Sequence, residues 1–176
     1  YVSHFGNDMR TRYIIDGFYE AAELLYKEIE SKYKIGFYSD ELIYPLCHSI
    51  RHTYELSLKD TLEKIKFFID NYKSCIDFDS NNYQSIHHTH NLKDLYNFIY
   101  QYIFQIDSRM LMLKETWEKV DYILDDFIYD EKSDAYRYST DVDGNENLSD
   151  IEYLSINKIF ENLKQYRNII SLVTTK

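Results

Sequence analysis

Apolar residues recur every three or four positions over long stretches of this chain, and only four glycines and one proline interrupt its 176 residues. Sandwiches and barrels need many more turn residues and an alternating pattern, so this periodicity favours helices. Apolar residues make up 44% of the chain, enough to bury one core, and the length suits one domain. The sequence therefore predicts an all-α, antiparallel helical bundle that forms a single domain over residues 1–176.

Five helical segments account for most of the chain. They are predicted at about Asp8 to Lys34, Ser39 to Tyr72, Asn91 to Ile106, Arg109 to Tyr129 and Asp150 to Val173. Gly36 is a plausible stop for the first segment, and Ser39 is a good N-cap for the second. Polar stretches without a period, at about 73–90 and 130–149, are predicted to be connector loops.

Charge and composition exclude several classes of protein. A formal net charge of −10 argues against a surface that binds nucleic acid generally through phosphate neutralisation, although a local basic groove stays open. Two cysteines form no disulfide framework. No apolar run reaches about 18 residues and no signal-peptide pattern occurs, so we expect a soluble cytoplasmic protein without a membrane partner. The first residue is Tyr rather than Met, which leaves open whether the native N-terminus is present.

A row of polar residues lies along one edge of the second predicted helix. His48, Arg51, His52, Glu55 and Lys59 fall within a sector of roughly 100° on a helix. An apolar face lies beside this row, so the row should border the core, where unpaired charges are costly. Arg51 with Glu55, and Glu55 with Lys59, are i,i+4 pairs. The simplest interpretation is an ion network that satisfies itself.

Three segments that contain or follow this row carry short motifs. Residues 42–59 contain a Tyr-Pro entry followed by Arg-His-x-x-Glu-Leu-x-x-Lys. Residues 90–96 contain His-x-Leu-x-x-Leu at the start of a later predicted helix, and residues 136–144 contain Arg-Tyr-x-x-Asp-x-x-Gly in a connector. These segments resemble the HEPN superfamily of helical nucleotide-binding domains, the last of them one bacterial branch, and their order and separations cover most of the chain.

The resemblance implies a commonly dimeric helical bundle that belongs to antiphage defence or toxin–antitoxin systems, in which many members cut RNA without a metal. The usual cutting motif is an Arg followed by a His after four to six intervening residues. None of the arginines has such a His; these are Arg10, Arg12, Arg51, Arg109, Arg137 and Arg167. The nearest substitute is the adjacent pair Arg51 and His52, whose geometry differs.

Metal-free RNA cleavage needs a general base, a general acid and a cation for the developing phosphate charge. If the chain is an enzyme, we expect His52 and His90 to exchange protons and Arg51 or Arg137 to bind phosphate, supported by His48, Glu55 and Lys59. No cofactor is expected. Two structural alternatives stay open: His90 bonds a local carbonyl or carboxylate, and Arg137 lies on the surface or ties its connector to Glu55.

Two stretches contain residue types and spacings that also occur in metal-binding sites. Neighbouring histidines at 87, 88 and 90 rarely converge on one ion, so we expect no metal there. The stretch from Asp141 to Glu152 places oxygen ligands at EF-hand positions, namely Asp141, Asp143, Asn145, Ser149 and Glu152. However, Glu146 stands where the loop needs Gly, and Ser149 with Glu152 forms a capping box instead. Calcium binding is therefore the less favoured interpretation.

Two classes of function stay open at this point. The first is a HEPN-like effector that acts on RNA or binds a nucleotide around Arg51, His52 and His90. The second is a non-catalytic helical module of the same fold that dimerises or docks on a protein partner such as an antitoxin. The missing Arg-to-His spacing favours the second, and the polar row favours the first.

Overall fold

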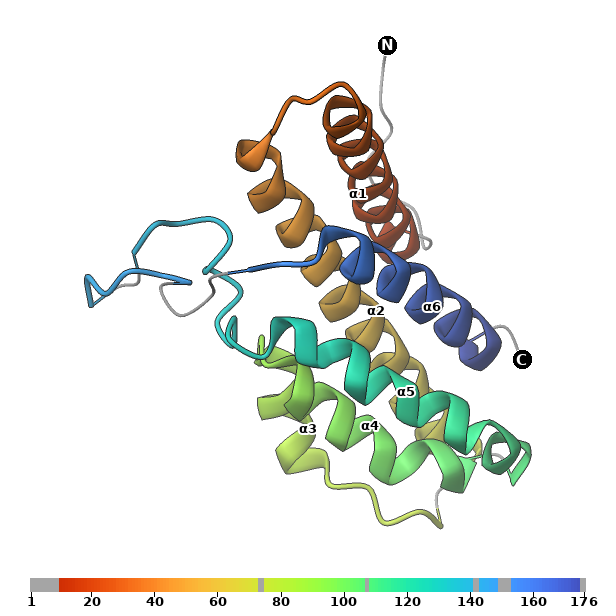
Figure 1. The fold of residues 1–176 in the computed structure, drawn as a ribbon. Helices are drawn as coiled ribbons and strands as arrows, with labels where there is room; N and C mark the ends of the chain where they lie inside the picture. Colours follow the sequence, from red (N-terminus) through yellow and green to blue (C-terminus); the bar gives the residue numbers. More distant parts are fainter. Residues whose placement is uncertain (1–9, 73–74, 107, 141–142, 149–152, 175–176) are drawn as a thin grey trace.

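The computed structural model describes residues 10–72, 75–106, 108–140, 143–148 and 153–174, and it confirms the all-α prediction (Figure 1). The α-helices and short 3₁₀ helices are α1 (Arg10–Lys34), η1 (Asp40–Leu42), α2 (Ile43–Tyr72), α3 (Ser80–His88), α4 (Leu92–Ile106), η2 (Ser108–Leu113), α5 (Lys114–Leu124), η3 (Asp125–Phe127) and α6 (Ile156–Thr174). Within these residues the only β-type contact is an isolated bridge between Thr140 and Glu146.

Helix α2 is the central element of the bundle. Helix α1 packs along one of its sides, α4 packs against another, and α6 contacts both α2 and α5 (Figure 1). The turn from α1 to α2 depends on Gly36, whose φ of 82° lies in the left-handed region. The amides of Gly36 and Phe37 bond the carbonyls of Tyr33 and Lys32, which is the Schellman pattern that ends a helix.

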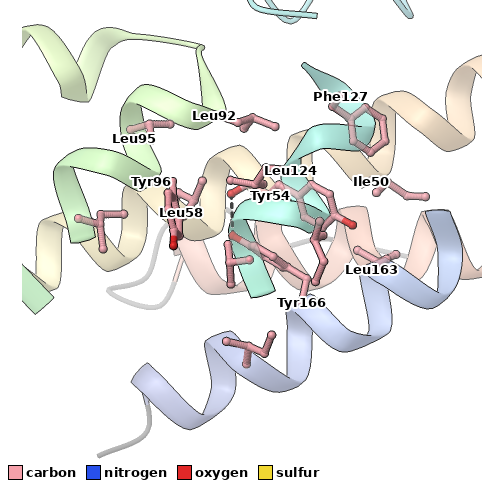
Figure 2. Packing of buried hydrophobic residues seen from close by; sticks show 14 of the residues in the cluster. Ile50, Tyr54, Leu58, Leu92, Leu95, Tyr96, Leu124, Phe127, Leu163 and Tyr166 are labelled. Atoms are coloured by element: carbon pink, nitrogen blue, oxygen red, sulfur yellow. Dashed lines mark hydrogen bonds between the residues drawn. The ribbon is translucent and has the colours of Figure 1, made fainter. Parts of the chain in front are cut away.

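The middle of the core is formed by α2, α4, α5 and α6 (Figure 2). Tyr166 of α6 donates a 3.1 Å hydrogen bond to the backbone carbonyl of Tyr54 on α2, and both rings are buried. Trp117 of α5 stacks on Tyr96 of α4, with ring centroids 5.8 Å apart. Because α2 buries side chains on several of its sides, its few charged residues within the core region must find partners there.

The structure corrects the prediction at three places. Residues 80–88, expected to lie in a loop, form α3, because the Asp79 side chain caps the amide of Asn82 and Tyr83 and Ile86 pack against the core. The predicted fourth helix is divided into η2, α5 and η3. The last helix begins at Ile156 rather than near residue 150. The capping box expected at Ser149 and Glu152 lies outside the described residues.

Among the described residues, no helix is both long enough and apolar enough to cross a membrane.

Candidate functional site

The guanidinium of Arg51 is fully buried at the centre of a polar network. Its Nη1 donates to Glu55 Oε2 at 2.8 Å, and its Nη2 donates to the carbonyls of His90 at 2.6 Å and Asp130 at 2.9 Å. Its Nε donates to the Asp130 carbonyl at 3.1 Å. Arg51 therefore joins α2 to the junction between α3 and α4 and to the connector that follows η3, and none of its surface is open to a ligand.

Asp130 is a partner of Arg51 that the sequence pattern did not predict. Its Oδ2 lies 3.0 Å from Arg51 Nε, in an ion pair whose alignment is too poor for a hydrogen bond. Its Oδ1 accepts hydrogen bonds from the amides of Asp134 and Ala135, at 2.9 and 3.0 Å. An Asp placed directly before a polar turn was the available signal, since such side chains often bond the amides that follow.

Glu55 is the second buried member of the network. Its Oε1 accepts hydrogen bonds from Lys59 Nζ at 2.9 Å and from His90 Nδ1 at 2.8 Å. Burial raises the pKa of this carboxyl, but hydrogen bonds from Lys59, Arg51 and His90 outweigh burial and lower the pKa to about 2. Glu55 is therefore ionised at neutral pH and can only accept hydrogen bonds.

His90 lies between α3 and α4, with 55% of its side chain exposed. Because Glu55 is an ionised acceptor, the 2.8 Å contact requires the proton of the neutral imidazole to sit on Nδ1. Nε2 is then an unprotonated acceptor. Asn91 fixes the backbone beside it by accepting hydrogen bonds from the amides of Lys93 and Asp94 at the start of α4.

His48 and His52 turn toward a different neighbour, Phe18 of α1. The His52 ring meets the Phe18 ring edge-on at 4.4 Å, and the two imidazoles stack 5.7 Å apart. Burial lowers the pKa of both histidines, so their neutral forms are favoured. The buried Nδ1 of His52 has no hydrogen-bond partner among the described residues. His52 and His90 therefore make no direct contact through which they could exchange a proton.

Arg137 is exposed, and its guanidinium lies 5.4 Å from the ring centre of Tyr138. Its positive charge lowers the pKa of His48 and His52, so it lies on their side of α2. Within the described part of the chain it is paired with no carboxylate. The connector is joined to Glu55 through Asp130 and Arg51.

The two stretches that imitate metal sites differ in how much the structure describes. His87 pairs with Glu63 at 2.9 Å. Asp141, Ser149 and Glu152 of the calcium interpretation lie outside the described residues, while Asp143 and Asn145 flank Gly144 in a turn next to the Thr140–Glu146 bridge. Across the described ranges, no three His, Cys, Asp or Glu side chains are arranged to hold a metal ion.

Comparison with known proteins adds no relative: no family model, no curated protein and no solved structure matches this chain. The site must therefore be interpreted from its own geometry. It contains a buried clamp, Arg51 with Asp130, and a buried carboxylate, Glu55, that holds one exposed imidazole.

Proposed function

We propose that this chain is a HEPN-like protein of a bacterial defence or toxin–antitoxin system that acts on RNA in the cytoplasm, with His90 as the proton-transferring group. One observation carries the proposal: a buried, ionised Glu55 holds Nδ1–H of His90, while 55% of the imidazole is exposed. A carboxylate that fixes the tautomer and orientation of an imidazole prepares its other nitrogen to act as a general base.

The reaction proposed is transesterification within RNA. His90 Nε2 takes the proton of a 2′-hydroxyl, whose oxygen attacks the adjacent phosphorus, and the bond to the 5′ oxygen breaks. The products are a 2′,3′-cyclic phosphate and a 5′ hydroxyl, whose oxygen takes a proton from water. The hydroxide that remains takes the proton from His90 and restores the neutral imidazole. Lys59, which shares Glu55 Oε1 with His90, supplies positive charge beside the phosphate. Arg51 is a positioning residue here, because its buried guanidinium holds Glu55 and the His90 backbone.

The test compares the wild type with His90→Ala on labelled RNA in EDTA. The assay is run near physiological ionic strength, because a chain with a net charge of −10 repels RNA and salt screens that repulsion. We expect cleavage by the wild type and a loss of about 10²-fold or more in His90→Ala. His88→Ala, at the exposed end of α3, is the matched control and should stay active. Absence of cleavage by the wild type, or full activity of His90→Ala, contradicts the proposal.

A second function, a non-catalytic helical module that dimerises or docks on a protein partner, is favoured by a different observation. Every polar nitrogen of Arg51 already bonds the protein, and the side chain is fully buried, as expected of a structural clamp. Measuring mass in solution by light scattering tests this function. A homodimer together with RNA left intact supports the module, whereas RNA cleavage that depends on His90 contradicts a purely structural role.

A further inference from the structure

A cavity of about 210 Å³ is lined by residues of α1, α2 and α6. Its α2 residues are Thr53, Ser57, Asp60 and Lys64. At about 100° per residue, these positions lie roughly 180–240° around the helix from Arg51, on the opposite face of α2. The cavity is therefore a separate feature of the bundle.

The charged side chains that line the cavity leave one cation in excess. Arg167 pairs with Asp16 at 3.2 Å, and Lys64 pairs with Asp60 at 2.6 Å. Arg12, one turn before Asp16 on α1, lines the same cavity and is paired with no carboxylate among the described residues. The chain as a whole has a net charge of −10, but this concave site has one positive charge in excess. The site therefore favours an anion.

Arg167 is held in place by the aromatic ring beneath it. Its guanidinium lies 3.9 Å from the ring centre of Tyr19, and Tyr19 is 8% exposed. Stacking uses the face of the guanidinium and leaves its edge, where the N–H groups point, for hydrogen bonds. Its Nη2 already donates to Asp16 at 3.2 Å, and the guanidinium, fixed in this way, loses little freedom when its remaining N–H groups bind a phosphate.

The α2 wall of the cavity offers acceptors rather than donors. The hydroxyl of Thr53 donates to the Ser49 carbonyl at 2.8 Å, and that of Ser57 donates to the Thr53 carbonyl at 2.7 Å. While these hydroxyl protons bond the carbonyls, each oxygen keeps a lone pair that can accept a hydrogen bond from a ligand. Guanidinium donors with hydroxyl acceptors match a ligand that carries an anionic head and hydroxyl groups.

Size and stacking restrict the ligand further. Pockets for drug-sized molecules measure roughly 300–1,000 Å³, and this cavity is smaller, at about 210 Å³. Tyr19 is buried beneath Arg167 and offers no open face for a base. We propose that the cavity binds a small hydroxylated phosphate monoester, with its phosphate at Arg12 and Arg167 and its hydroxyls at Thr53 and Ser57.

Calorimetric titration of the full chain with ribose 5-phosphate, inorganic phosphate, ribose and AMP tests this proposal. We expect ribose 5-phosphate to bind and to weaken about tenfold or more in Arg12→Gln, which loses a charge-assisted hydrogen bond. Thr53→Val should weaken ribose 5-phosphate but not inorganic phosphate. Lys27→Gln removes an exposed cation of α1 outside the cavity and should change nothing.

Several outcomes overturn the proposal. If ribose 5-phosphate does not bind at millimolar concentration, the proposed site does not exist. If Arg12→Gln and Lys27→Gln weaken its binding equally, the binding is general charge attraction. AMP binding as tightly as ribose 5-phosphate contradicts the size limit. Thermal melting of each variant checks folding; Arg12 is exposed, so Arg12→Gln should fold normally. RNA cleavage through His90 does not depend on any of these results, so failure of the phosphate site would leave the ribonuclease proposal standing, and the reverse also holds.

Discussion

Glu55 and His90 are 35 positions apart in the sequence, yet Oε1 of the first and Nδ1 of the second lie 2.8 Å apart. The pair joins the middle of α2 to the junction between α3 and α4. The carboxylate is buried while the imidazole is 55% exposed, so one end of the pair is fixed by the protein and the other faces solvent. This asymmetry fixes one nitrogen of the ring and leaves much of the imidazole exposed.

Replacing Arg51 should strongly destabilise the protein. Arg51→Ala leaves the buried carboxylate of Asp130 without its cation and leaves Glu55 with Lys59 alone, and breaking a buried pair typically costs about 3–5 kcal/mol. Urea unfolding at pH 7 measures the loss. Lys27→Ala removes one partner of an exposed pair with Glu23 and should change the free energy of unfolding by less than about 1 kcal/mol. A similar small change for Arg51→Ala would contradict the structural role of the clamp.

Glu55 should make stability depend on pH in the acid range. Its pKa falls from 4.5 to about 2 on folding, so its contribution is fully present above pH 4.5 and is lost as pH falls toward 2. The difference corresponds to something on the order of 3 kcal/mol. Urea unfolding of wild type and Glu55→Gln at pH 6 and pH 3 measures it. The variant should lose less stability over this interval, and identical losses would show that Glu55 is not held as described.

His52 should make stability depend on pH closer to neutrality. Burial lowers the pKa of His52 below 6.5, so the folded protein favours the neutral ring while the unfolded chain becomes protonated first. Its contribution is therefore present above pH 6.5 and is lost as pH falls through the lower, folded pKa. His52→Leu keeps an apolar contact with Phe18 and removes the orphan Nδ1, so its melting temperature should drop less between pH 7.5 and 5.5. An imidazole NMR titration with a midpoint above 6.5 would contradict this.

The existence of α3 can be tested through its cap. Asp79 accepts a hydrogen bond from the Asn82 amide at 3.0 Å, and losing an N-cap side chain typically costs about 1 kcal/mol. Asp79→Ala should lower the free energy of unfolding by that amount, while Asp77→Ala, two residues earlier and exposed, serves as the control. Equal effects of the two substitutions would indicate that the segment gains nothing from this cap.

The periodic pattern located most helices to within a few residues, because each of those helices has a continuous apolar face that the 3.6-residue repeat reveals. It failed for α3, which has few apolar residues and depends on a cap and on packing of Tyr83 and Ile86. It also missed the 3₁₀ turns on both sides of α5, since a change from α to 3₁₀ geometry leaves little trace in an apolar pattern.

The polar row on α2 was likewise predicted only in part. The helical repeat by itself determined that Arg51, Glu55 and Lys59 would share one edge of α2 and pair along it, as they do. Only the tertiary structure decided that Glu55 would meet His90, that Arg51 would meet Asp130, and that His52 would turn to Phe18. Helical geometry fixes the angles between residues of one helix. The partners come from α1, the α3–α4 junction and the connector, and the positions of these elements depend on how the whole hydrophobic core packs.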